Sequence, residues 1–241
     1  MSSQIPVGTI HIHQRFCGPS DSGNGGYVAG LLASRLAGPV EVTLSRPLPL
    51  NRPLRLDQEA DAVRLFDRDL LLATAVPSDA DLPEPRSAVS MAEARSAAAA
   101  CAVVVHPDWH PAPSCFVCGN ARGEDALRIF PGPIAEGRYA APWTPSLDLA
   151  DGGRVRPEFV WAALDCPSSF LIYDPPGTRP DGFFVLGRMT ARIDADVMAG
   201  EAHIVQSWLL ERAGRKLHSA SALQRGNGEI LAVARATWIS I

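Results

Sequence analysis

The chain contains the same order of predicted elements twice, and this repeat limits its possible folds more than any other feature. In each half, a candidate strand precedes one helix, and three or four long segments with strand periodicity follow it. The first half has these segments at 8–16 (strand), 24–38 (helix), 39–50, 52–69 and 70–78 (strands). The second half has them at 137–145 (strand), 156–174 (helix), 183–198, 200–215, 216–229 and 230–241 (strands). This order predicts an α+β protein built on antiparallel sheets.

Local signals support both helices. Asn24 is a suitable N-cap for the first, and the pair Gly38-Pro39 is expected to stop it. Pro157 suits the first turn of the second helix. Pro167 should kink or end that helix, because proline lacks a backbone donor and clashes with the preceding turn.

A connecting segment separates the two halves. It begins rich in proline and acids, becomes rich in alanine, and ends rich in proline. Its middle starts with a capping box from Ser90 to Glu93, which predicts a helix around 91–101. We therefore expect a first module at 1–85, a linker at 86–114 and a second module at 115–241.

Composition excludes several classes of protein. The chain has 241 residues and a net charge of -4 without a basic block, so nucleic acid is not its expected main partner. No stretch approaches the roughly 20 apolar residues of a membrane helix, and the start resembles no signal peptide. Five cysteines, an odd number, suit a reducing compartment, and we expect a cytoplasmic protein that binds no membrane.

Three short segments resemble hotdog-fold thioesterases. "GNGGYVAGLL" is similar to the His/Asn-Gly-Gly opening of the central helix in hotdog acyl-CoA thioesterases. "CFVCGNARGEDALRIFPG" resembles the Cys-x-x-Cys-Gly segment that begins many single hotdog modules. "VWAALDCP" is similar to the stretch with the catalytic Asp in the second half of the acyl-CoA thioesterase II family. The resemblance implies a tandem, or double, hotdog: two helices, each wrapped by an antiparallel sheet, in a pseudo-dimer with one continuous sheet.

The spacing of these residues predicts one site rather than two. In single hotdog thioesterases of the phenylacetyl-CoA type, an Asp lies nine positions after the motif's His. Nine positions after Asn24 is Ala33, whereas nine positions before Asp165 is Arg156, which Pro157-Glu158 follow instead of glycines. In homodimeric relatives, each site combines the glycines of one subunit with the acid of the other. Here only one such combination is complete, namely Asn24-Gly25-Gly26 with Asp165.

This combination suits thioester hydrolysis. Unpaired N–H groups at a helix start can stabilise the oxyanion of the transition state, and we expect Gly26, then Gly25, to donate. Asp165 would activate water as a general base or attack the thioester directly. If the helix continues past Pro167, Ser168 and Ser169 could orient the acid or the water.

The resemblance also implies residues on later strands. The acyl-CoA thioesterase II type uses a Thr and a Gln beside its Asp; Thr190 is a loose match for the Thr, and the last strand offers only Thr237 where the Gln should be. The predicted catalytic residues are Asp165, Gly26, Gly25, Asn24, Ser169 and Thr190. The predicted substrate-binding residues are Tyr27, Trp161, Ser168 and Arg188.

Structural interpretations remain open for the same residues. Asp165 could bind backbone groups or an arginine across the helix pair, and Gly25-Gly26 could serve a turn and close packing. His106, His110, Cys115 and Cys118 have a spacing that could bind zinc. Cys17, Cys101 and Cys166 are most simply small buried residues.

We therefore predict a thioesterase that acts on an acyl-CoA or acyl-carrier thioester, with neither a metal nor a cofactor. A non-catalytic protein that binds acyl-CoA is an alternative, which the missing Gln favours. A hotdog hydratase is a second alternative, which the lack of a His near Asp165 in sequence opposes. By analogy with hotdog relatives, we expect a homo-oligomer.

Overall fold

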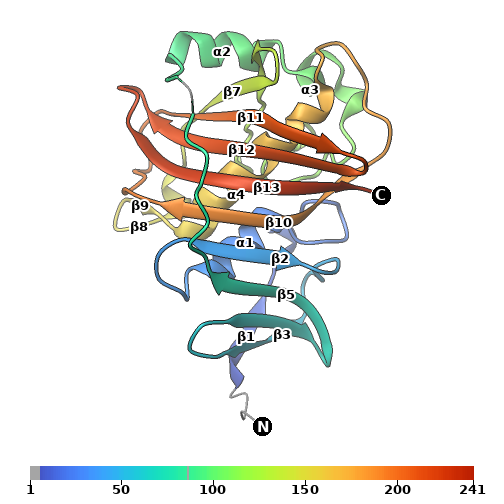
Figure 1. Cartoon of the computed structure of the whole chain (residues 1–241), viewed down its shortest axis with the longest axis vertical. Helices are drawn as coiled ribbons and strands as arrows, with labels where there is room; N and C mark the ends of the chain where they lie inside the picture. Colours follow the sequence, from blue (N-terminus) through green and yellow to red (C-terminus); the bar gives the residue numbers. More distant parts are fainter. Residues whose placement is uncertain (1–5, 86) are drawn as a thin grey trace.

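Eleven strands form one continuous antiparallel sheet through the molecule (Figure 1). The computed structural model describes residues 6–85 and 87–241. The strands of this sheet are β1 (Pro6–His11), β2 (Val40–Leu44), β3 (Pro53–Gln58), β4 (Val63–Asp67), β5 (Leu70–Pro77), β6 (Gly132–Ala135), β7 (Arg138–Trp143), β10 (Phe184–Ile193), β11 (His203–Ala213), β12 (Lys216–Arg225) and β13 (Ile230–Ser240). A separate small ladder joins β8 (Ala150–Asp151) and β9 (Arg154–Val155). The α+β class predicted from the sequence is confirmed.

The strand order reveals an approximate two-fold relation between the halves. The first half runs β1-β3-β4-β5-β2 from its edge, and the second runs β10-β13-β12-β11-β7, with β6 added outside β7. β2 and β10 are equivalent, since each is the first strand after the helix of its half. They pair at the centre, with Thr190 opposite Glu41. The halves therefore form the predicted pseudo-dimer with one continuous sheet.

The two central helices pack against each other in opposite directions. α1 (Gly25–Ala33) and α4 (Pro157–Ser169) lie behind the sheet in Figure 1. Gly26 near the start of α1 contacts Asp165, whereas Gly30 one turn later contacts Glu158 near the start of α4. The remaining helices are α2 (Met91–Ala99) and α3 (Ala102–Val105), with short 3-10 turns at Gln14–Phe16, Pro107–Trp109, Leu147–Leu149 and Phe170–Tyr173.

Two glycines allow this close approach. A Cβ built on Gly26 would lie 2.3 Å from Asp165 Cβ, and one on Gly30 would lie 2.5 Å from Glu158 Cα. Positions four residues apart share one helix face, so both glycines turn the same side of α1 toward α4. The close packing that the sequence left open for the glycine pair is therefore found at Gly26. Its partner is the helix α4 rather than the sheet.

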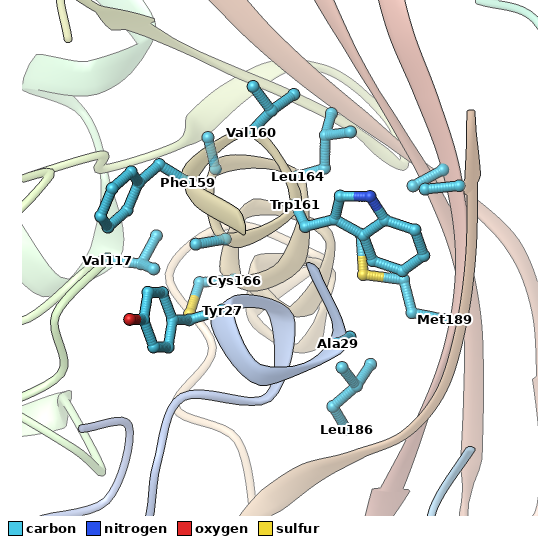
Figure 2. Packing of buried hydrophobic residues seen from close by; sticks show 14 of the residues in the cluster. Tyr27, Ala29, Val117, Phe159, Val160, Trp161, Leu164, Cys166, Leu186 and Met189 are labelled. Atoms are coloured by element: carbon cyan, nitrogen blue, oxygen red, sulfur yellow. The ribbon is translucent and has the colours of Figure 1, made fainter. Parts of the chain in front are cut away.

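Apolar side chains surround the helix pair on all sides (Figure 2). Tyr27 stacks on Phe16 with ring centroids 4.3 Å apart, and Phe159 lies 5.6 Å from Tyr27. On the opposite side of α4, Trp161 points toward the sheet, where Met189 lies (Figure 2). Every residue of α4 from Phe159 to Ser168 is buried. Asp165 is therefore a carboxyl group in the middle of a buried helix.

Hydrogen bonds from the sheet stabilise the end of α4. The prediction that Pro167 ends this helix is wrong. The helix continues to Ser169. Ser221 Oγ donates to Leu164 O at 2.7 Å, and Ser207 Oγ donates to Pro167 O at 2.9 Å. These bonds from β12 and β11 satisfy carbonyl groups in the last turns, which helps tertiary packing override the local effect of proline.

Other boundaries differ in smaller ways. α1 ends at Ala33 rather than near position 38, the segment 52–69 forms the two strands β3 and β4, and β6 was not predicted. The connecting helix is confirmed as α2, including the capping box of Ser90 and Glu93. Ahead of α2, the chain crosses the outer face of the sheet, where the Gln224 side chain binds Val89 N and O at 3.1 and 2.7 Å. The division at 85/86 and 114/115 stays a prediction.

Candidate functional site

Asp165 lies against the N-terminus of α1. Its Oδ2 accepts a hydrogen bond from Gly26 N at 2.8 Å and a second from Asn24 Nδ2 at 3.2 Å. Its Oδ1 is buried and has no partner within the described chain. The sequence therefore correctly predicted that the glycine segment of the first half meets the acid of the second, and one carboxylate oxygen remains available.

Asn24 has two functions in this arrangement. Its Oδ1 accepts from Tyr27 N at 2.9 Å, which is the N-cap interaction predicted from the sequence. Its Nδ2 then points to Asp165 and toward two thiols, Cys166 Sγ at 3.5 Å and Cys115 Sγ at 3.9 Å. The cap thus fixes the amide so that its donor group faces the acid.

The surroundings of Asp165 favour its protonated form. Burial raises the pKa of Asp165 from 3.8 to about 7, the Gly26 N–H lowers it, the Cys115 thiol raises it further, and the Asn24 amide lowers it. No arginine, lysine or histidine forms an ion pair with it among the salt bridges of residues 6–85 and 87–241. A carboxyl group with such a pKa can exchange a proton near neutral pH.

The two glycine N–H groups are not equivalent, which corrects the predicted order of donors. Gly26 N–H is occupied by Asp165. Gly25 N–H, the first of the helix, forms no hydrogen bond in the described part of the protein. Since Gly25 also lines the cavity described below, it is the donor left for a ligand.

A cavity of about 570 Å³ reaches this helix start. Asn24, Gly25 and Asp165 lie in its wall, as do exposed residues such as Arg46, so the cavity is open to solvent. Most of the remaining wall is apolar, from Leu44, Pro47, Leu48, Phe170, Ile172, Phe183, Phe184, Val185, Leu186, Trp238 and Ile239. Its shape and lining suit an apolar group attached to a polar head.

Neither serine bonds the carboxylate of Asp165, as one of the predicted roles required. Ser168 Oγ donates to Asp165 O at 2.8 Å and accepts from Trp238 Nε1 at 2.9 Å, so it binds the backbone of the acid rather than its carboxylate. Ser169 lines the cavity, but its Oγ donates to Cys166 O at 2.7 Å. Hydroxyl groups three residues along a helix reach back to carbonyl groups, and neither serine orients the carboxylate.

The other predicted residues lie away from the acid. Thr190 Oγ1 donates to Glu41 Oε2 at 3.3 Å, and exposed Arg188 pairs with the same glutamate, so neither reaches the cavity wall. Tyr27 and Trp161 are buried in the core beside the helices and are not part of that wall. Thr237, the polar residue nearest the expected Gln, binds His218 Nδ1 at 3.1 Å on the sheet. The Thr and Gln pattern of the resemblance is therefore not assembled around Asp165.

The equivalent position in the other half holds no site of this kind. The N-caps of α1 and α4 are Asn24 and Arg156, the two positions matched from the sequence. The second helix begins with Pro157, which has no N–H to donate. Glu158 follows, and its carboxylate pairs with Arg156 at 3.1 Å. The partner position on α1 is Ala33, which has no acid.

The convergence of three thiols beside Asp165 was not predicted. Cys115 and Cys118 precede β6, and Cys166 follows Asp165 on α4; their Sγ atoms all lie within 4.8 Å of one another. Cys166 is therefore more than a small apolar residue. Hydrogen bonds from the Cys118 and Cys166 thiols lower the pKa of Cys115. The Cys-x-x-Cys spacing signalled two of the three, but nothing local in the sequence linked them to Cys166.

The two histidines whose spacing left zinc binding open do not join this cluster. His106 is exposed and stacks on Trp109 at 4.1 Å between ring centroids. His110 lies in the cavity wall, but its Nε2 bonds Cys118 O at 2.8 Å and its Nδ1 accepts from Ala112 N at 3.0 Å. Both ring nitrogens of His110 are thus occupied.

Comparison with known proteins identifies structures of the same fold. No protein-family model matches the chain, and no curated protein matches it. The structure of the tesB protein of Mycobacterium avium subspecies paratuberculosis is 12% identical, covers 99% of this chain and 96% of its own, and has a TM-score of 0.63. Acyl-CoA thioesterase II TesB2 from Mycobacterium marinum is 10% identical over 91% of this chain and 90% of its own, with a TM-score of 0.61. The predicted double hotdog fold is confirmed.

Across residues 6–85 and 87–241, no helix is both long and apolar enough to cross a membrane.

Proposed function

We propose that this protein hydrolyses the thioester of an acyl-CoA or acyl-carrier substrate at one site between α1 and α4. The observation that carries the proposal is the contact of Asp165 with the N-terminus of α1 in the wall of an open, largely apolar cavity. It joins a carboxylate and an unpaired backbone donor, the two groups that acyl transfer from sulfur to water requires.

Gly25 N–H is the proposed oxyanion donor. It is unpaired, it lies at the positive end of α1, and the carbonyl oxygen of a bound thioester gains negative charge as water attacks. Gly26 N–H can contribute when Asp165 moves toward the substrate. Removing one such donor typically lowers kcat by about 100-fold or more.

Asp165 is the proposed base or nucleophile. As a base, its carboxylate takes one proton from water while the oxygen of that water bonds to the thioester carbon; collapse then breaks the C–S bond, and the thiolate takes up the proton. As a nucleophile, the carboxylate bonds to the thioester carbon, the C–S bond breaks and the thiolate leaves; water then cleaves the resulting anhydride, which releases the acid and regenerates Asp165. The free Oδ1 suits either role, since Oδ2 is held by Gly26 and Asn24.

The cavity wall suggests where the two parts of the substrate bind. The apolar wall from Leu44, Phe170, Phe184 and Leu186 would take the acyl group. Arg46 lies in the wall, is exposed and forms no salt bridge in the described ranges, so it can bind a phosphate of the carrier. This role replaces the one predicted for Arg188. Association of several copies and a reducing, cytoplasmic location remain predictions.

A binding protein without catalysis is the second candidate. The missing Thr and Gln beside Asp165 favour it, because hydrolysis would then depend on the carboxylate and the helix start alone. Such a protein would bind acyl-CoA with the carbonyl oxygen on Gly25 and release no thiol.

Thiol release from short, aromatic and long acyl-CoAs distinguishes the candidates. We expect turnover of at least one substrate by the wild type and its loss in Asp165→Asn. Glu158→Gln is the matched control, because it removes the carboxylate of the equivalent helix, and its activity should stay near wild type. Absence of turnover with a ligand-dependent rise in Tm would support the binding protein and refute hydrolysis.

A further inference from the structure

Three buried thiols converge beside Asp165 from two distant parts of the chain. Cys115 and Cys118 lie on the turn before β6, and Cys166 lies on α4. The Sγ atoms of Cys115 and Cys166 are 3.6 Å apart, although 51 positions separate the two residues. All three cysteines line the cavity, so the cluster can be reached from solvent.

The turn that carries Cys115 and Cys118 is tightly built. Gly119 N donates to Cys115 O at 2.9 Å, and a Cβ on Gly119 would lie 2.4 Å from the same oxygen. His110 Nε2 bonds Cys118 O at 2.8 Å and holds the turn from outside. Two thiols on a rigid Cys-x-x-Cys turn, with a third from a helix, form a frequent arrangement of zinc ligands.

A carboxyl group lies next to the cluster. Asp165 Oδ2 lies 4.0 Å from Cys166 Sγ, and Asp165 Oδ1 is buried without a hydrogen-bond partner anywhere in the described residues. Three thiols and a carboxyl group thus lie together in one buried place, and no salt bridge within residues 6–85 and 87–241 involves Asp165. A divalent cation would satisfy the free oxygen and balance the charge of the ionised thiols.

We propose that Cys115, Cys118 and Cys166 bind Zn²⁺, and that Asp165 completes the site after its carboxyl group shifts toward the thiols. Tetrahedral zinc with Zn–S bonds of about 2.3 Å places its sulfur ligands about 3.8 Å apart. The 3.6 Å between Cys115 and Cys166 is close to this separation. Binding releases the thiol protons to solvent, and the Asn24 amide, which already faces Cys166 and Cys115, stabilises the resulting charge.

This site goes beyond the proposed hydrolysis and limits it. A carboxylate that binds zinc is no longer available to activate water, so zinc should inhibit thioester hydrolysis and a chelator should restore it. The metal site does not depend on that activity, and its test measures the metal itself.

The test is titration of the reduced, chelator-treated protein with Co²⁺, which replaces zinc and absorbs strongly when thiolates bind it tetrahedrally. We expect a thiolate-to-cobalt band that saturates at one ion per chain and disappears when Zn²⁺ is added. Cys115→Ser, Cys118→Ser and Cys166→Ser should each weaken Co²⁺ binding by more than about 10-fold. Cys101→Ser, which changes a buried thiol outside the cluster, is the matched control and should bind like the wild type.

Native mass spectrometry of the wild type with Zn²⁺ tests the site without any variant, so its result does not depend on whether a variant folds. One zinc per chain supports the site. Absence of a stoichiometric metal complex by both methods, or a cobalt band that all three serine variants retain, would overturn it. Failure of the zinc site would leave the hydrolysis assay of Asp165→Asn unaffected, so the two proposals fail separately.

Discussion

Replacement of Asp165 by asparagine should stabilise the metal-free protein above pH 7. The buried carboxyl group has a pKa near 7 rather than 3.8, and each unit of such a shift corresponds to 1.36 kcal/mol. Keeping it ionised in the folded protein therefore costs about 4 kcal/mol at pH 8. Asparagine has nearly the same shape, retains an acceptor for Gly26 N–H and has no charge to bury.

The sign of the pH dependence follows from the direction of the shift. Because the pKa of Asp165 is raised on folding, the folded protein binds more protons than the unfolded one between pH 3.8 and about 7. The free energy of unfolding should fall by about 1.4 kcal/mol per pH unit in this window through this group alone. The advantage of Asp165→Asn should thus be small at pH 4 and reach about 4 kcal/mol above pH 7.

Urea unfolding of wild type and Asp165→Asn across this range, with reductant and chelator present, measures the difference. Asp148→Asn is a suitable control, since Ser146 and then Arg15 lower the pKa of this largely exposed acid and its removal should bring no gain at pH 8. A less stable Asp165→Asn at pH 8 would mean that the carboxylate is a structural bond to α1, and the reasoning would be refuted.

Three further predictions concern packing, substrate and pH. Gly30→Ala should lower the free energy of unfolding by about 1–3 kcal/mol, because its Cβ would lie 2.5 Å from Glu158 Cα; unchanged urea unfolding would contradict the close helix contact. Arg46→Ala should raise KM for an acyl-CoA while kcat changes little, and an equal KM in steady-state kinetics would exclude its phosphate role. In metal-free protein, kcat/KM should rise with pH through about 7 as Asp165 ionises, and a profile flat from pH 5 to 9 would show that this group does not control the rate.

Much of the fold could be predicted because its signals are local. Strand periodicity and turn residues predicted eight strands near their observed positions and covered β3 and β4 with one segment, and the caps at Asn24 and Ser90 marked two helices. Pro167 was misleading because serines of β11 and β12 donate hydrogen bonds to backbone carbonyl groups in the last turns of α4. These serines are far away in the sequence, so the local pattern does not indicate the contact. Strand β6 is short and lies at the edge of the sheet, so it carries little periodic signal.

The parts of the site that depend on the spacing of two helix positions were predicted. The parts that depend on long-range contacts were missed. The nine-position spacing from each N-cap linked Asn24 to Ala33 and Arg156 to Asp165, and antiparallel packing then joined Gly26 to Asp165. Occupation of Gly26 N–H was not foreseen, because it depends on how closely the helices approach. Convergence of the three thiols depends on how the loop with Cys115 and Cys118 packs against α4, for which helical or strand periodicity carries no information.

The most direct measurement of the central claim is kcat/KM for thiol release by wild type and Asp165→Asn at pH 8, on the preferred acyl-CoA, in reduced and chelator-treated protein. Both proteins are folded in this comparison if the variant is at least as stable as the wild type. Our account predicts a decrease of about 100-fold or more in the variant. Equal rates within about 10-fold, or a wild type that turns over no acyl-CoA, would contradict it.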